Sequence, residues 1–100
     1  MAFQISSVKP RYFDFEDPET GKILHLEPPK LGTVNEFEKL DSNNTPEDLA
    51  SVIAQMISKN MEKREVTAAD VLNWMDGDQA SAFIRAFMGW MNGVRLSDPN

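Results

Sequence analysis

Two consecutive prolines, Pro28 and Pro29, divide the sequence into a short strand-forming part and a longer helical part. Neither proline can donate a backbone hydrogen bond to a sheet, and each restricts the preceding residue to an extended conformation. Alternating apolar residues come before the pair, and a helical periodicity follows it. The expected fold is therefore α+β and mainly α, with an N-terminal β-hairpin packed on a bundle of three to four helices.

The stretch FDFEDPETGKILHL predicts a hairpin with a defined register. A four-residue PETG loop places Phe13 opposite Leu26 and Phe15 opposite Leu24, so that these four apolar side chains share one face. A shift by one residue would move carboxylates onto that face, and burial selects against it. A weaker alternation over residues 3–8 is a candidate third strand, because two strands alone are marginal in water.

The first two helices have start signals in the sequence. Thr33 with Glu36 three residues later fits a capping box that opens a short helix through Leu40. Thr45 stands directly before a proline and two acidic residues, which predicts the N-cap of a second helix. That helix is expected to run to about residue 62.

Two further helices follow. Thr67 and Asp70 open a third, shorter helix, which the Asp-Gly-Asp sequence at residues 76–78 interrupts. The last helix is expected over residues 79–92, with Gly93 placed to end it.

Length and charge indicate one compact acidic domain. A chain of 100 residues fits a single domain with an expected radius of gyration of roughly 13 Å. We expect a hairpin region over 1–30, a helical region over 33–93 and a tail over 94–100. The net charge of −6 repels phosphates and anionic lipid, so neither nucleic acid nor membrane is an expected partner. Without cysteine or a long apolar run, the chain is expected to be cytoplasmic.

Few side chains could support catalysis or metal binding. The single histidine, His25, excludes a His-paired metal site or a Ser-His-Asp triad within one chain, and we expect it on the sheet surface beside Asp14. The carboxylates are spread over every element and follow no calcium-loop pattern. Arg11 and Arg64 are isolated basic spots in a net negative field rather than a stripe that could read a nucleic-acid groove. The sequence therefore predicts no catalytic residue, no cofactor and no metal site.

The last helix has a wider apolar arc than one core contact requires. At about 100° per residue, its apolar side chains extend well beyond the stripe of roughly 100° that faces a core. Either the small domain wraps this helix on two sides, or the excess serves self-association or a partner. The helical methionines suit core filling or an adaptable binding groove. The expected partner-binding residues are Phe83, Phe87, Met88, Trp90 and Met91, with Trp74 and Met75 nearby.

Four segments succeed one another between residues 12 and 93: the hairpin YFDFEDPETGKILHLEPP, LGTVNEFEKLDS turning into helix, the amphipathic TPEDLASVIAQMISKN, and VTAADVLNWMDGDQASAFIRAFMGWMNG. The last of these has a T-x-x-D start, an acidic break and a final apolar helix. This layout resembles that of the tail assembly chaperones of long-tailed, siphophage-like bacteriophages.

The resemblance implies a non-enzymatic protein of the infected host's cytoplasm. Such a protein holds the tape measure protein and helps to recruit tail tube subunits before it leaves the finished tail. The resemblance also implies self-association through the helical part and, in many such families, a longer form made by translational frameshifting. Two alternatives stay open, a minor structural head-tail component and an acidic DNA-mimic inhibitor of a host protein. A small enzyme ranks below both, because one His, one Tyr and no Cys leave little for a catalytic pocket.

Overall fold

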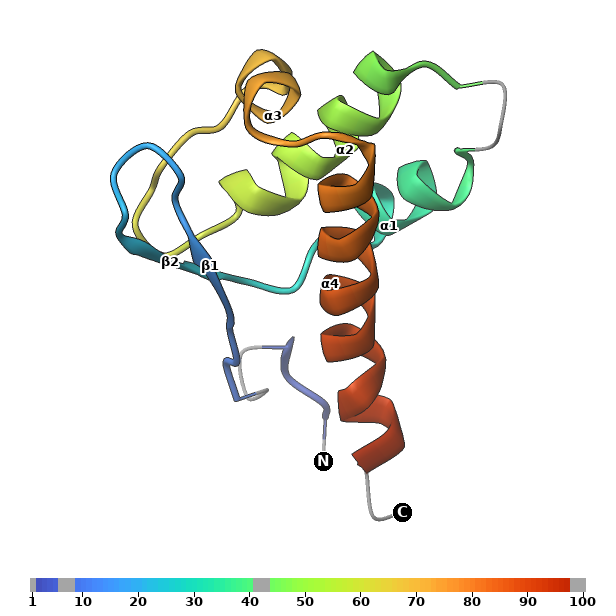
Figure 1. Cartoon of the computed structure of the whole chain (residues 1–100). Helices are drawn as coiled ribbons and strands as arrows, with labels where there is room; N and C mark the ends of the chain where they lie inside the picture. The colour runs from blue at the N-terminus through green and yellow to red at the C-terminus, as the bar shows by residue number, and fades with distance from the viewer. Residues whose placement is uncertain (1, 6–8, 41–43, 98–100) are drawn as a thin grey trace.

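The computed structural model describes residues 2–5, 9–40 and 44–97, with side chains up to residue 92. Helices dominate it, and a single hairpin lies at the N-terminal side, so the expected α+β, mainly α class is confirmed (Figure 1). The elements are β1 (Phe13–Glu16), β2 (Ile23–Leu26), α1 (Leu31–Glu38), α2 (Pro46–Ser58), α3 (Ala68–Trp74) and α4 (Gly77–Ser97).

The hairpin has the predicted register. Phe13 pairs with Leu26 and Phe15 with Leu24, antiparallel. The turn closes at Asp17, whose C=O accepts from the N–H of Gly21 at 2.8 Å, and Gly21 has the positive φ of 75° that glycine adopts without strain. The candidate third strand is not seen over residues 3–5, and residues 6–8 of that prediction lie outside the described residues.

The second edge of β2 is paired with the segment that follows α2. The N–H of Glu27 donates to the C=O of Lys59 at 2.8 Å, and the N–H of Met61 donates to the C=O of His25 at 3.1 Å. This pairing explains why α2 ends at Ser58 rather than near the expected residue 62. The chain leaves the helix there and runs beside β2.

Helix starts agree with the sequence at two of three predicted caps. The hydroxyl of Thr45 accepts from the backbone N–H of Asp48, and that of Thr67 accepts from the backbone N–H of Asp70. In each case the aspartate carboxylate accepts from the backbone N–H of the threonine, which completes a capping box. The predicted box at Thr33 is wrong, because α1 already begins at Leu31 and Thr33 lies within it. The extended Lys30 that follows the two prolines serves as its N-cap instead.

Helix α4 is longer than expected at both ends. Asp76 and Gln79 exchange hydrogen bonds at its start, with the N–H of Gln79 donating to Asp76 Oδ1 at 2.8 Å, so the helix begins at Gly77. At the other end it passes through Gly93 and continues to Ser97, so Gly93 does not end it. The part of the predicted tail up to residue 97 is therefore helical, and residues 98–100 lie outside the described residues.

The core lies where α2, β2 and α4 meet. Ile53 and Ile57 of α2, Leu26 of β2 and Phe87 of α4 are each 0% exposed. The radius of gyration is 14.5 Å and the molecule extends over 47 × 32 × 21 Å. This radius of gyration exceeds the roughly 13 Å expected of a compact chain of this length. The molecule is elongated because the C-terminal end of α4 runs beyond the other elements (Figure 1).

Candidate partner-binding surface

One side of α4 is filled by the aromatic residues of the hairpin. The Phe13 ring centroid lies 5.3 Å from that of Phe87, 6.0 Å from Phe83 and 5.7 Å from Trp90. Phe15 continues the contact, at 5.6 Å from Phe83. Edge-to-face pairs at these separations add to the gain from burial. The hairpin therefore covers this flank of α4.

This packing corrects the expected partner-binding set. Phe83 is 8% exposed and Phe87 is 0% exposed, so both lie in the core; Phe87 offers no side-chain surface to a partner and Phe83 offers little. Their place in the apolar arc is explained by the hairpin, which the sequence could not position on a particular side of the helix.

Trp90 is only partly exposed, because Arg11 covers one side of its ring. The guanidinium carbon lies 4.2 Å from the ring centroid, a cation–π distance. The same guanidinium donates to the backbone C=O of Trp90 at 3.3 Å and of Met91 at 3.4 Å. Arg11 therefore has a structural role that the sequence did not indicate. It fastens the segment before β1 to the far part of α4.

Trp74 belongs to a polar network at the hairpin turn. Its indole N–H donates to Glu19 Oε2 at 2.9 Å. Arg64 donates to Glu19 Oε1 at 3.3 Å and to Asp17 Oδ2 at 2.9 Å. Arg64 thus joins the loop after α2 to the hairpin.

Asp17 is the buried member of this network and is 1% exposed. Burial by itself raises the pKa of the Asp17 carboxyl. The hydrogen bond and positive charge of Arg64, together with the backbone N–H of Glu19, outweigh burial and hold that pKa below its usual value. Asp17 therefore remains ionised inside the fold.

His25 lies on the outer face of the hairpin, beside Asp14 as expected. Its Nδ1 is 2.6 Å from Glu62 Oε2, and its Nε2 is 3.9 Å from Asp14 Oδ1. The hydrogen bond to Glu62 raises the pKa of His25, and the backbone and ring N–H groups of His25 lower the pKa of Glu62. This pair holds the segment after α2 against β2.

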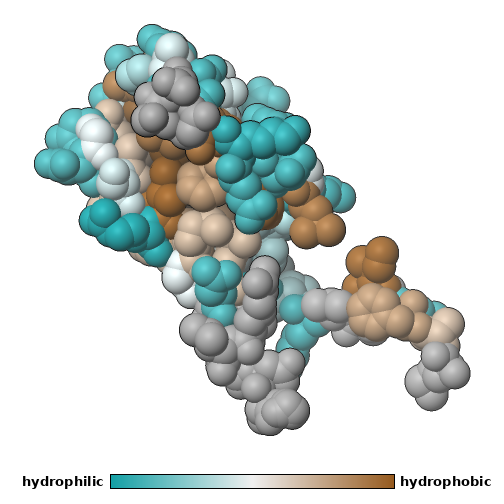
Figure 2. Space-filling model, turned by 90° about the vertical axis from the view of Figure 1, so that its right-hand side faces the viewer, coloured by the Kyte–Doolittle hydropathy of each residue, from teal (hydrophilic) through white to brown (hydrophobic). Residues whose placement is uncertain are grey.

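Another line of apolar side chains on α4 lies beside the hairpin contact and is partly exposed. At about 100° per residue, positions 80, 84, 88 and 91 fall within one narrow sector of the helix. Ala80 is buried, whereas the other three are partly exposed. On the face drawn in Figure 2, hydrophobic residues gather in the middle of the main body, with hydrophilic residues around them. We call this line the α4 seam: Ala80, Ile84, Met88 and Met91.

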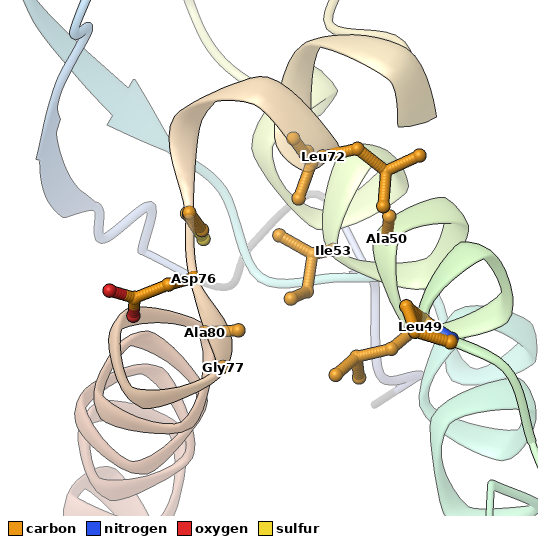
Figure 3. Close-up of a pocket in the computed structure, with 10 residues that line it drawn as sticks. Leu49, Ala50, Ile53, Leu72, Asp76, Gly77 and Ala80 are labelled. Carbon is orange, nitrogen blue, oxygen red and sulfur yellow. The ribbon is translucent and has the colours of Figure 1, made fainter.

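A small cavity opens at the start of the α4 seam. Its volume is about 90 Å³, and side chains of α2, α3 and the first turn of α4 converge on it (Figure 3). Its walls include Leu49, Ile53 and Met75, together with Leu72, which is 43% exposed. A cavity of roughly 150 Å³ accepts benzene, so this smaller one suits a single aliphatic side chain.

The seven expected residues are therefore divided among four environments. Phe83 and Phe87 lie in the core, and Trp90 and Trp74 are tied to Arg11 and to Glu19. Met75 lines the cavity, and Met88 and Met91 belong to the α4 seam. Leu49 and Leu72, which line the cavity, were not predicted as site residues. In the sequence, an apolar residue at the edge of a helical stripe cannot be distinguished from a core residue.

Many carboxylates have structural partners. Asp48 and Asp70 close capping boxes, and Glu27 forms an ion pair with Lys59 at 2.8 Å. A DNA mimic needs an array of free carboxylates, which these residues do not supply. Within the described part of the chain, no three His, Asp or Glu side chains are grouped closely enough to hold a metal ion, and no helix could cross a membrane.

Comparisons with known proteins found no relative of this chain. No protein-family model, curated protein or solved structure matches this chain.

Proposed function

We propose that this protein is a non-enzymatic tail assembly chaperone of a long-tailed bacteriophage, which holds helical segments of the tape measure protein. In this proposal it works in the cytoplasm of the infected host, associates with itself and helps to recruit tail tube subunits. The observation that supports it best is the α4 seam, a partly exposed apolar line that continues from a cavity between α2, α3 and α4. The layout of the sequence supports it independently.

The α4 seam has the features expected of an apolar strip on which a partner helix can pack, and its first residue, Ala80, borders the cavity. A helix that lies in a groove anchors through apolar residues spaced three or four apart, and the cavity can receive one such anchor. Two of the seam residues, Met88 and Met91, have flexible and polarizable side chains that adapt to different anchors. The net charge of −6 keeps a protein with such a surface soluble.

The test is capture of helical fragments of the tape measure protein from the same phage by this chain. We expect the unaltered protein to retain a fragment, and Met88→Asp and Ile84→Asp to lose at least about 90% of the capture, because a carboxylate on the seam is desolvated on binding. Arg85→Asp is the matched control, since Arg85 lies on the same helix and is exposed but is not part of the seam. Circular dichroism confirms that each variant is folded.

Two results would contradict the proposal in different ways. If the unaltered protein retains no tape measure fragment, the chaperone function is wrong. If Met88→Asp and Ile84→Asp are folded and retain fragments as well as Arg85→Asp does, the partner binds elsewhere. Phe87→Asp is not a useful variant, because it places a charge in the core.

A further inference from the structure

The outer edge of β1 is unpaired among the described residues. The N–H of His25 donates to Glu62 at 2.9 Å and its C=O accepts from Met61, so both groups point away from β1. Asp14 lies opposite His25. Asp14 and His25 are thus a non-hydrogen-bonded pair, in which the backbone N–H and C=O groups of both residues point away from the partner strand. Such pairs recur every two residues along an antiparallel ladder. The N–H and C=O groups of Asp14 and Glu16 therefore point out of the sheet.

A shallow groove of about 430 Å³ runs along this edge, between the hairpin and helices α3 and α4. Phe13, Phe15 and Trp74 contribute apolar surface to it. On α4 the groove is bordered by Ala82 and Ala86, which are exposed and carry small side chains one turn apart. These small side chains leave room for another chain beside β1.

The charges at the groove have one sign. Among the described residues that line it, the charged ones are Asp14 and Glu16, whose side chains are on the outer face of the hairpin. Pairing with β1 of a second copy would place these carboxylates opposite carboxylates, and like charges directly opposite are destabilising. The occupant that complements this edge therefore carries positive charge.

We propose that an extended segment of a protein partner, with Lys or Arg alternating with apolar residues, adds to β1 as an antiparallel third strand. Its basic side chains lie opposite Asp14 and Glu16, and its apolar side chains enter the groove between Phe15 and α4. Strand addition of this kind takes affinity from backbone hydrogen bonds and specificity from alternate side chains. The site does not involve the α4 seam, so it does not rest on the proposed function.

The probe is an acetylated and amidated Lys-Val-Lys-Val-Lys-Val-Lys peptide, titrated into ¹⁵N-labelled protein. We expect chemical-shift changes at residues 13–16 and binding roughly tenfold tighter than that of the Glu-Val counterpart, as two exposed ion pairs imply. Glu16→Lys, at an exposed position, is expected to reverse or abolish this preference. A peptide N-methylated at its lysines, which lacks the N–H groups that face β1, is expected not to bind. The same peptide N-methylated at its valines is the matched control.

A second pair of variants tests the groove itself. Ala86→Phe fills the groove and is expected to abolish binding of the peptide. Ser81→Phe, at an exposed position outside the groove, is expected to leave binding unchanged. Amide spectra confirm that both are folded. The proposal is overturned if the Lys-Val peptide does not bind at millimolar concentration, or if methylation at lysine or Ala86→Phe leaves binding unchanged. It is also overturned if the free protein is a dimer that Ala86→Phe dissociates, since the occupant is then a second copy.

Discussion

At the scale of single residues, the ion pair between Asp17 and Arg64 joins the hairpin turn to the loop between α2 and α3. Asp17 is 1% exposed, and its two carboxylate oxygens accept from Arg64 and from the N–H of Glu19. The turn could be predicted from its Pro and Gly, but this ion pair could not. Its partners are 47 residues apart, and no local pattern relates them.

Asp17→Asn is expected to lower the free energy of unfolding by about 1–3 kcal/mol at pH 7, because a buried charge-assisted hydrogen bond is lost. The folded-state pKa of Asp17 is below its unfolded value, so its contribution is fully present above the unfolded pKa and is lost as pH falls through the folded pKa. The difference between variant and unaltered protein should therefore shrink below about pH 4. Urea denaturation followed by Trp fluorescence at pH 7 and pH 3 measures it.

Glu38→Gln is the matched control for Asp17→Asn, because Glu38 is exposed on α1. Its effect is expected within about 0.5 kcal/mol. If Asp17→Asn has the same effect at both pH values, the Arg64 contact does not stabilise the ionised carboxylate.

At the scale of elements, the sequence predicted helix starts well where a cap was sharply defined. Thr45 and Thr67 are N-caps as expected, but Thr33 is not, because the chain becomes free to turn helical directly after the two prolines. Helix ends were predicted less well. Helix α2 ends before residue 60 because Asn60 forms a β-bridge with Leu26. Helical periodicity cannot reveal such a tertiary contact.

Thr45→Ala and Thr67→Ala should each lower the free energy of unfolding by about 1 kcal/mol, because each leaves a backbone N–H at a helix start without its acceptor. Thr33→Ala is the control within the same sequence pattern. Thr33 lies inside α1, so replacement by alanine should cost little or stabilise slightly. Thermal or urea denaturation compares the three variants. Equal losses at all three positions would contradict the cap assignments.

At the scale of the whole molecule, the contact between the hairpin and α4 joins the two ends of the chain. The hairpin register and the apolar arc of α4 were both predictable from periodicity, and both are found. Which part of the arc the hairpin covers was not predictable, because Phe83, Ile84, Phe87 and Met88 are equally apolar. The partition into core and α4 seam appears only when the elements are assembled.

Phe87→Ala tests this partition and should lower the free energy of unfolding by about 3–5 kcal/mol, as for other buried aromatic residues. Met88→Ala, one residue away and partly exposed, should cost less than half as much. Urea denaturation of both variants under the same conditions makes the comparison. Similar losses would mean that the α4 seam is as much a part of the core as the hairpin contact is.

The cation–π contact and the hydrogen bond between Arg11 and Trp90 join residues that are 79 positions apart. A ribosome that adds about 5–20 residues per second incorporates Trp90 roughly 4–16 s after Arg11. Until Phe83 and Phe87 have been added, Phe13 and Phe15 lack the rings of α4 that they contact in the folded protein. The apolar face of the hairpin can therefore be buried only after α4 has been synthesised past Phe87.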